Sequence, residues 1–114
     1  MAGALKRIAG PAYLAAAAAD IYTPPASTIY TVIKHIRVSN KTGASATFTL
    51  YLGATGGSAG GTEITGLSES VAANDHKDMY FSPGLKAIST DFLSGLASAA
   101  TTLTILVMGE QHVV

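Results

Sequence analysis

The side chains best suited to metal binding or acid–base chemistry are three histidines, His35, His76 and His112. A metal site would need them to converge, yet the surrounding pattern predicts a strand, a turn and the C-terminal segment, with no HExxH motif. His76 lies between Asp75 and Asp78, but this stretch lacks the ligand spacing and the glycine of a calcium loop. The sequence therefore predicts neither a metal site nor a bound cofactor.

The hydroxyl and carboxylate groups do not form the pattern of an activated nucleophile or an acid–base pair. Ser58 and Ser94 do not fit the G-x-S-x-G elbow, which also requires an α/β setting. The glycine-rich residues 53–61 lack the Gly-Lys-Ser/Thr ending of a phosphate-binding loop. The carboxylates are scattered, and the sequence singles out no pair for glycoside hydrolysis. We expect a protein that is not an enzyme.

The composition narrows the classes of partner. The chain has 114 residues, no cysteine, 12% charged residues and no net charge. The lack of cysteine excludes a disulfide framework, and neutrality argues against nucleic acid as the main partner, because phosphate binding needs a surplus of basic residues. A weakly charged protein tends to associate, and no apolar run is long enough to cross a bilayer. These properties indicate a subunit of an assembly, expected to be a homo-oligomer without a membrane partner.

The N-terminal segment differs in character from the rest of the chain. Lys6 and Arg7 precede an alanine-rich stretch, which is one feature of a secretory signal, but Gly10 and Pro11 interrupt that stretch. The prolines on both sides leave too little length for an isolated helix. We expect residues 1–25 to form an extended arm that docks onto a neighbour.

The remaining chain, residues 26–114, has the pattern of short β-strands. Residues 31–52 contain two β-rich runs joined by Asn-Lys-Thr-Gly, which predicts a β-hairpin. In the first run, alternation places Tyr30 and Val32 on the same side as Ile36, and Lys34 predicts a bulge. Residues 77–81 and 85–88 are expected to be separate strands around a Pro-Gly turn.

Short strands with frequent turns, and no helical periodicity, are typical of a sandwich or barrel. We predict an all-β, single-domain antiparallel β-sandwich, jelly-roll-like, with an extended N-terminal arm. The inward positions of the alternating runs predict a core of Ile36, Val38, Phe48, Leu50, Leu52, Leu103, Ile105 and Val107.

Contact surfaces are expected where tyrosines and the N-terminal arm lie, because tyrosine is favoured at protein interfaces. The predicted arm interface consists of Leu5, Lys6, Arg7, Ile8, Tyr13 and Tyr22. A second predicted contact face consists of His35, Arg37, Tyr51 and Tyr80. Tyr51 is assigned to the surface because it alternates with Phe48 and Leu50.

Several segments resemble small virion proteins of tailed bacteriophages. The matching segments are LKRIAGP (5–11), IYTPP (21–25), IRVSNKTG (36–43), ATFTLYLGA (46–54), VAAND (71–75) and TLTI (102–105). The resemblance implies a structural protein located in the virion, a capsid decoration or cement subunit docked through its arm onto major capsid or tail subunits. A tail or head–tail connector role, and a carbohydrate-binding module for host adsorption, are the alternatives.

Overall fold

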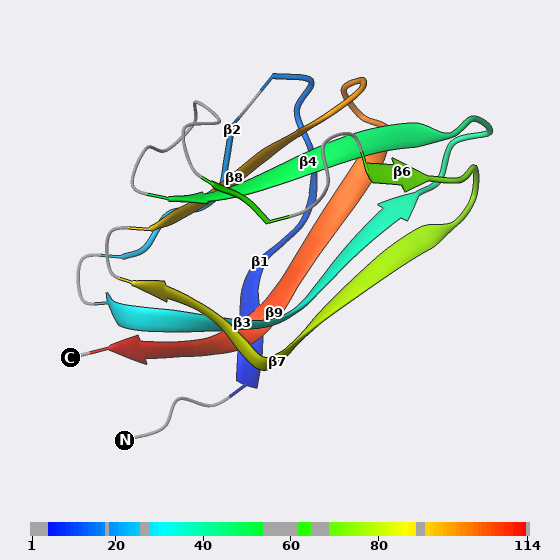
Figure 1. Cartoon of the computed structure of the whole chain (residues 1–114). Coiled ribbons are helices and arrows are strands. Elements are labelled where there is room, and N and C mark those ends of the chain that lie inside the picture. The colour runs from blue at the N-terminus through cyan, green and yellow to red at the C-terminus, as the bar shows by residue number, and fades with distance from the viewer. Residues whose placement is uncertain are drawn as a thin grey trace.

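The computed structural model describes residues 5–17, 19–25, 28–53, 62–64, 69–88 and 91–113, and these form a sandwich of two antiparallel sheets (Figure 1). The strands are β1 (Leu5–Tyr13), β2 (Ala19–Tyr22), β3 (Thr28–Asn40), β4 (Ala46–Gly53), β5 (Thr62–Glu63), β6 (Glu69–Val71), β7 (His76–Ile88), β8 (Phe92–Ala97) and β9 (Leu103–Val113). Sheet A has the order β1–β9–β3–β7, and sheet B the order β2–β8–β4–β5, with β6 also paired to β4. The predicted all-β sandwich is confirmed.

Within the described residues, no helix is long and apolar enough to cross a membrane.

The core lies between the sheets and is filled by alternate residues of the long strands, as the pleat of a β-strand requires. Ile36 and Val38 of β3, Leu50 of β4 and Val107 of β9 are all 0% exposed. Of the predicted core residues, Leu52 is partly buried and the others are almost completely buried. The alternating runs of the sequence therefore predicted this core correctly.

A β-bulge divides β3 into two halves with opposite alternation. Its register with both β7 and β9 shifts between Ile33 and His35, which confirms the predicted bulge. Because of this shift, Ile33 is buried on the same side as Ile36, whereas Tyr30 and Val32 share the outer face with His35. The expectation that Tyr30 and Val32 point to the side of Ile36 is wrong.

The segment between β3 and β4 is a corner between the two sheets. β3 pairs with β7 and β9, and β4 pairs with β5, β6 and β8, so the predicted hairpin is wrong. The Asn40 side chain accounts for the difference. Its Oδ1 accepts hydrogen bonds from the backbone N and Oγ1 of Thr42 (2.9 and 2.7 Å), and its Nδ2 donates to the carbonyl oxygens of Ala44 and Val71 (2.9 and 3.1 Å). The turn residues bend the chain, and the buried amide directs it across to sheet B.

The N-terminal segment supplies one strand to each sheet. β1 pairs with β9 at one edge of sheet A, and β2 pairs with β8 at one edge of sheet B. Leu14 and Tyr22 are 2% and 7% exposed and belong to the core. The segment is extended as predicted, but it packs within the sandwich because these side chains fill space between the sheets. Its docking onto a neighbouring protein, and the domain boundary after residue 25, stay predictions.

β7 is one strand where the sequence predicted two. Its pairing with β3 passes from Tyr80 opposite His35 to Leu85 opposite Ile33. The extra residues 81–84 are accommodated with Gly84 at φ 141°, a conformation that residues with a side chain rarely adopt. The Pro-Gly pair therefore marks an irregularity within a continuing strand, and the chain does not reverse there.

Candidate functional site

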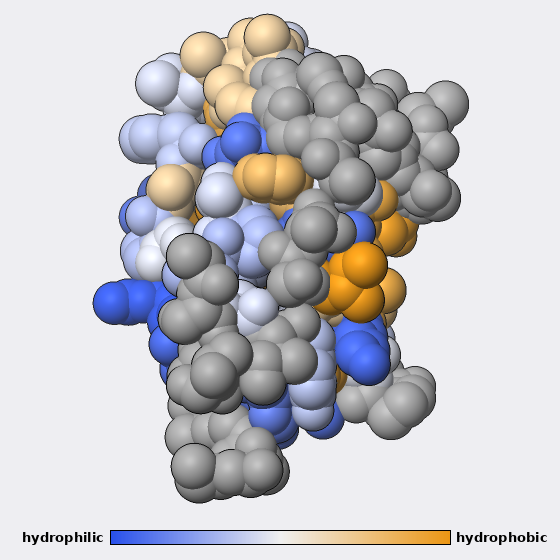
Figure 2. Space-filling model, turned by 90° about the vertical axis from the view of Figure 1, so that its left-hand side faces the viewer, coloured by the Kyte–Doolittle hydropathy of each residue, from blue (hydrophilic) through white to orange (hydrophobic). Residues whose placement is uncertain are grey.

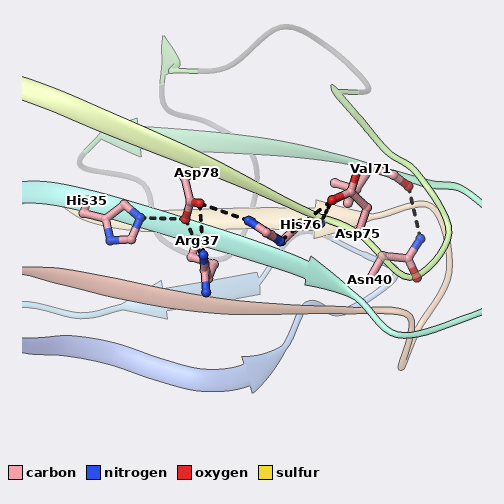
Figure 3. A network of polar contacts seen from close by, with 7 residues as sticks. All are labelled: His35, Arg37, Asn40, Val71, Asp75, His76 and Asp78. Atoms are coloured by element: carbon pink, nitrogen blue, oxygen red, sulfur yellow. Dashed lines mark hydrogen bonds and ion pairs between the residues drawn. The ribbon is translucent and has the colours of Figure 1, made fainter.

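Asp78, in the edge strand β7, is the centre of a polar cluster on the outer face of sheet A (Figure 3). Arg37 donates from Nε to Asp78 Oδ1 (2.8 Å) and from Nη2 to Oδ2 (3.2 Å). His35 Nε2 lies 2.8 Å from Oδ1, and His76 Nε2 lies 3.3 Å from Oδ2. One carboxylate thus contacts a guanidinium and two imidazoles that come from two strands.

Strand register brings these side chains together. Arg37 lies opposite Asp78, and His35 lies opposite Tyr80. The intervening pair, Ile36 and Met79, packs on the core side. Because side chains alternate between the two faces of a sheet, the polar residues at every second position form a continuous surface.

The charges in the cluster stabilise one another. The hydrogen bond from Arg37, followed by that from His35, holds the pKa of Asp78 well below its ordinary range. The same carboxylate raises the pKa of the Arg37 guanidinium. A carboxylate held so strongly in its charged form is a weak proton acceptor, so the arrangement suits ion pairing better than acid–base catalysis.

Two stacked ring pairs lie on the same outer face. The His35 and Tyr80 rings are 4.5 Å apart and inclined by 8°, and the Tyr80 side chain is 75% exposed. The Tyr30 and His112 rings are 4.3 Å apart and inclined by 18°, with Lys86 Nζ 4.7 Å from the Tyr30 ring. Stacking fixes the orientation of rings that would otherwise rotate freely at the surface.

The three histidines therefore occupy one sheet face, although they do not meet at one point. We call this surface the histidine face. It comprises Tyr30, His35 and Arg37 of β3, His76, Asp78, Tyr80 and Lys86 of β7, and Glu110 and His112 of β9. In the part of the chain that the structure describes, no group of three or more histidines and carboxylates is placed to hold a metal ion.

Three of the four residues of the predicted contact face lie close together, and their contact with a partner stays a prediction. His35, Arg37 and Tyr80 lie together in the histidine face. Tyr51 lies in β4 of sheet B, is 9% exposed and does not belong to the core cluster. Its alternation away from the core was read correctly, but the surface position predicted from that alternation is wrong.

Some residues of the predicted arm interface lie at the surface, and others pack in or against the core. Lys6 and Arg7 are exposed, Tyr13 is 62% exposed, and Lys6 Nζ donates to Gln111 Oε1 (2.9 Å). Leu5 is placed by its backbone opposite Glu110. Ile8 packs against the core, and the buried Tyr22 hydroxyl lies 2.8 Å from Thr31 Oγ1. The surface role expected of Tyr22 is therefore wrong, because this side chain stabilises the sandwich interior.

The sequence pattern placed His76 in a turn and Asp78 in the strand 77–81, and it missed their partners on β3. The available signal was the alternation of polar residues at positions 76, 78 and 80, matched by positions 35 and 37. That signal predicts two polar strand faces but does not say that the two strands are neighbours.

Figure 2 shows a mixed surface on the side of the molecule that it draws. On the residues drawn in colour in Figure 2, the hydrophobic patches are small and are separated by hydrophilic ones. This mixed surface is consistent with a composition of 48% hydrophobic and 12% charged residues.

Comparisons with known proteins identify the fold. No protein-family model and no curated protein matches this chain. A solved structure of Bacillus endospore appendages, described as a novel family of disulfide-linked pili, matches with a TM-score of 0.57 and 18% sequence identity. The match covers 100% of this chain and 91% of the other.

This match overturns the function that the sequence led us to expect. A capsid decoration subunit, with the virion as its location, is wrong, as are the tail, connector and host-adsorption alternatives, because the similar structure belongs to a bacterial surface appendage. The short turn-and-strand segments that carried the phage resemblance are common to many β-sandwiches, so they did not distinguish one kind of assembly from another.

Proposed function

We propose that this chain is a structural subunit that assembles with copies of itself into a filamentous appendage of a bacterial surface. The observation that carries this proposal is the likeness of the whole chain to a protein of endospore appendages whose family is described as pili. Because the likeness extends over 100% of this chain, it concerns the complete sandwich.

The surface chemistry of the chain supports a role in contact. The chain has no net charge and only 12% charged residues, so copies repel one another little. Its most prominent polar cluster has its charges paired and its rings stacked. Such a surface offers shape and aromatic area, which are the properties that protein interfaces use.

The way in which subunits are held together must differ from the disulfide links of the similar pili. This chain contains no cysteine, so it cannot form a disulfide with another copy. Its filaments would depend on burial of apolar surface and on hydrogen bonds.

Electron microscopy of the purified chain tests the proposal. We expect filaments of uniform width to form as the protein is concentrated near neutral pH, with the same filaments in the presence and absence of a reducing agent. Sedimentation of the same samples should show the monomer disappearing as filaments appear. A chain that sediments only as an 11.5 kDa monomer at every concentration would contradict the proposal.

A further inference from the structure

We propose that the histidine face is a contact between copies of this chain, one that forms near neutral pH and opens when its histidines become protonated. This inference rests on the proposed function, since it names one of the contacts between subunits and the condition that opens it. A two-fold contact joins subunits in pairs, and a filament continues through a second, different contact.

The face has the features of a contact surface at its β7 edge. Tyr80 is 75% exposed, yet its ring is held parallel to His35 at 4.5 Å. Ile88, further along the same strand, is 52% exposed. Large side chains that are already fixed lose little conformational freedom on binding, so they contribute strongly to an interface.

The charges of the histidine face are compatible with binding to the same face of a second copy of this chain. The residues that define the histidine face carry no net charge when its histidines are neutral, because Arg37 and Lys86 are offset by Asp78 and Glu110. Arg7 of β1 lies on the same outer side but beyond this set, at the opposite edge of the sheet. A two-fold contact places the same surface on both partners, and a balanced surface can meet its own copy without net repulsion. The described fold spans 44 × 25 × 20 Å, so one sheet face is broad enough for the ~800 Å² that each partner buries in a standard interface.

Each histidine faces a carboxylate whose charge is already part of that balance. His35 contacts Asp78, stacks on Tyr80 and is flanked by Arg37 and, in the bulge, by Lys34.

The other two histidines have comparable surroundings. His76 lies 3.3 Å from Asp78 and 3.8 Å from Asp75. His112 lies 3.5 Å from Glu110 and stacks on Tyr30, whose ring also lies beside Lys86. At the far edge of the sheet, β1 places the exposed Arg7 opposite Met108 of β9.

Lowering the pH makes the histidine face more positive. Histidine is the side chain that ordinarily gains a charge as the pH falls from 8 to 5, while carboxylates ordinarily stay ionised in that range. Arg37 keeps the pKa of Asp78 low, so this carboxylate does not lose its charge in parallel. Protonation of a histidine adds one positive charge to its own chain, and in a two-fold contact the same happens on the partner. Like charges that face one another in a covered contact are unfavourable. The contact should therefore be released in acid.

The first experiment compares the wild-type chain with the His35→Gln/His76→Gln/His112→Gln variant at about pH 8 and about pH 5. Sedimentation velocity gives the assembled fraction, and circular dichroism checks that both proteins are folded. We expect wild type to be assembled at the higher pH and released at the lower one, and the variant to stay assembled at both. Release of the variant to the same extent as wild type would overturn the inference.

A second pair of variants locates the contact without changing a histidine. Tyr80→Lys adds a charge to the histidine face, and Ser70→Lys adds the same charge on the exposed side of β6 in sheet B. At pH 8 we expect Tyr80→Lys to weaken the association constant about tenfold or more and Ser70→Lys to leave it unchanged. Equal effects of the two variants would overturn the inference.

The experiment also separates this inference from the function on which it rests. Assembly of the wild-type chain that is insensitive to pH would overturn the histidine-face contact alone. A wild-type chain that remains monomeric at both pH values would overturn the proposed function and the contact with it.

Discussion

The side-chain amide of Asn40, at the end of β3, donates a hydrogen bond to the carbonyl oxygen of Val71 in β6 (3.1 Å) and so connects sheet A to sheet B. Asn40 is 2% exposed, and its amide also donates to Ala44. Replacing it with alanine leaves buried acceptors without this donor. We expect Asn40→Ala to lower the free energy of unfolding by about 1–3 kcal/mol. Urea unfolding measures the change, and Ser45→Ala, at an exposed position in the same corner, is the control. A loss no larger than that of the control would contradict the role of the amide.

Asp78 should make the stability of the fold depend on acid. Its pKa is lower in the folded chain than its ordinary value of about 3.8. The stability that it contributes is therefore fully present above that ordinary value and is lost as the pH falls through the folded-state pKa. We expect Asp78→Asn to lower Tm at pH 7, and the difference from wild type to shrink as the pH falls below about 4. Thermal unfolding across this range measures it. Asp75→Asn, at a more exposed carboxylate beside His76, is the control.

The N-terminal segment should be necessary for the fold itself. Leu14 is 2% exposed and belongs to the core, while the preceding Tyr13 is 62% exposed. We expect Leu14→Ala to lower the free energy of unfolding by about 2–5 kcal/mol because it leaves a cavity. Tyr13→Ala is the matched control and should change stability by less than about 1 kcal/mol. If both substitutions prove equally mild in chemical denaturation, the segment is an appendage of the sandwich and not a part of its core.

Gly109 should tolerate no side chain. It lies where β9 passes close to β3, and a Cβ atom added there would overlap the carbonyl oxygen of Val32. The strands would have to move apart, so we expect Gly109→Ala to cost about 1–3 kcal/mol. Gly43→Ala, in the corner after β3, places its methyl group in open space and serves as the control. Comparable midpoints of urea unfolding for the two variants would show that the strands adjust freely.

Filaments of this chain should be dissociated by agents that disrupt non-covalent contacts. Because the chain has no cysteine, we expect SDS or urea to return filaments to monomers without a reducing agent. Gel electrophoresis of purified filaments, with and without reductant, should show one band at the monomer position in both lanes. A ladder of larger species in SDS would reveal a covalent link of another kind.

The sequence predicted best those features that one strand determines alone. The alternation of Phe48 and Leu50, and of Leu103 and Ile105, identified the core, and Lys34 marked the bulge. These are local consequences of the period of a β-strand.

Features that depend on which strands are neighbours were predicted poorly. The turn after Asn40 was recognised, but turn residues do not say whether the next strand joins the same sheet. Tyr51 was read as exposed because alternation assigns a face and says nothing of what covers that face. The cluster at Asp78 needed the pairing of β3 with β7, whose partners are some forty positions apart. Such pairings are set by the packing of the whole sandwich.

The place of β9 in sheet A determines when this sheet can close. β9 is the final strand in sequence order, yet it lies between β1 and β3 and pairs with both. During synthesis β1 and β3 therefore leave the ribosome without the strand that separates them, and sheet A cannot close until residues 103–113 have emerged. Pairing between such distant segments is slow, and unpaired strands of a nascent chain are prone to pair with other chains. We therefore expect the insertion of β9 to be the step that covers the facing edges of β1 and β3 in a newly made subunit.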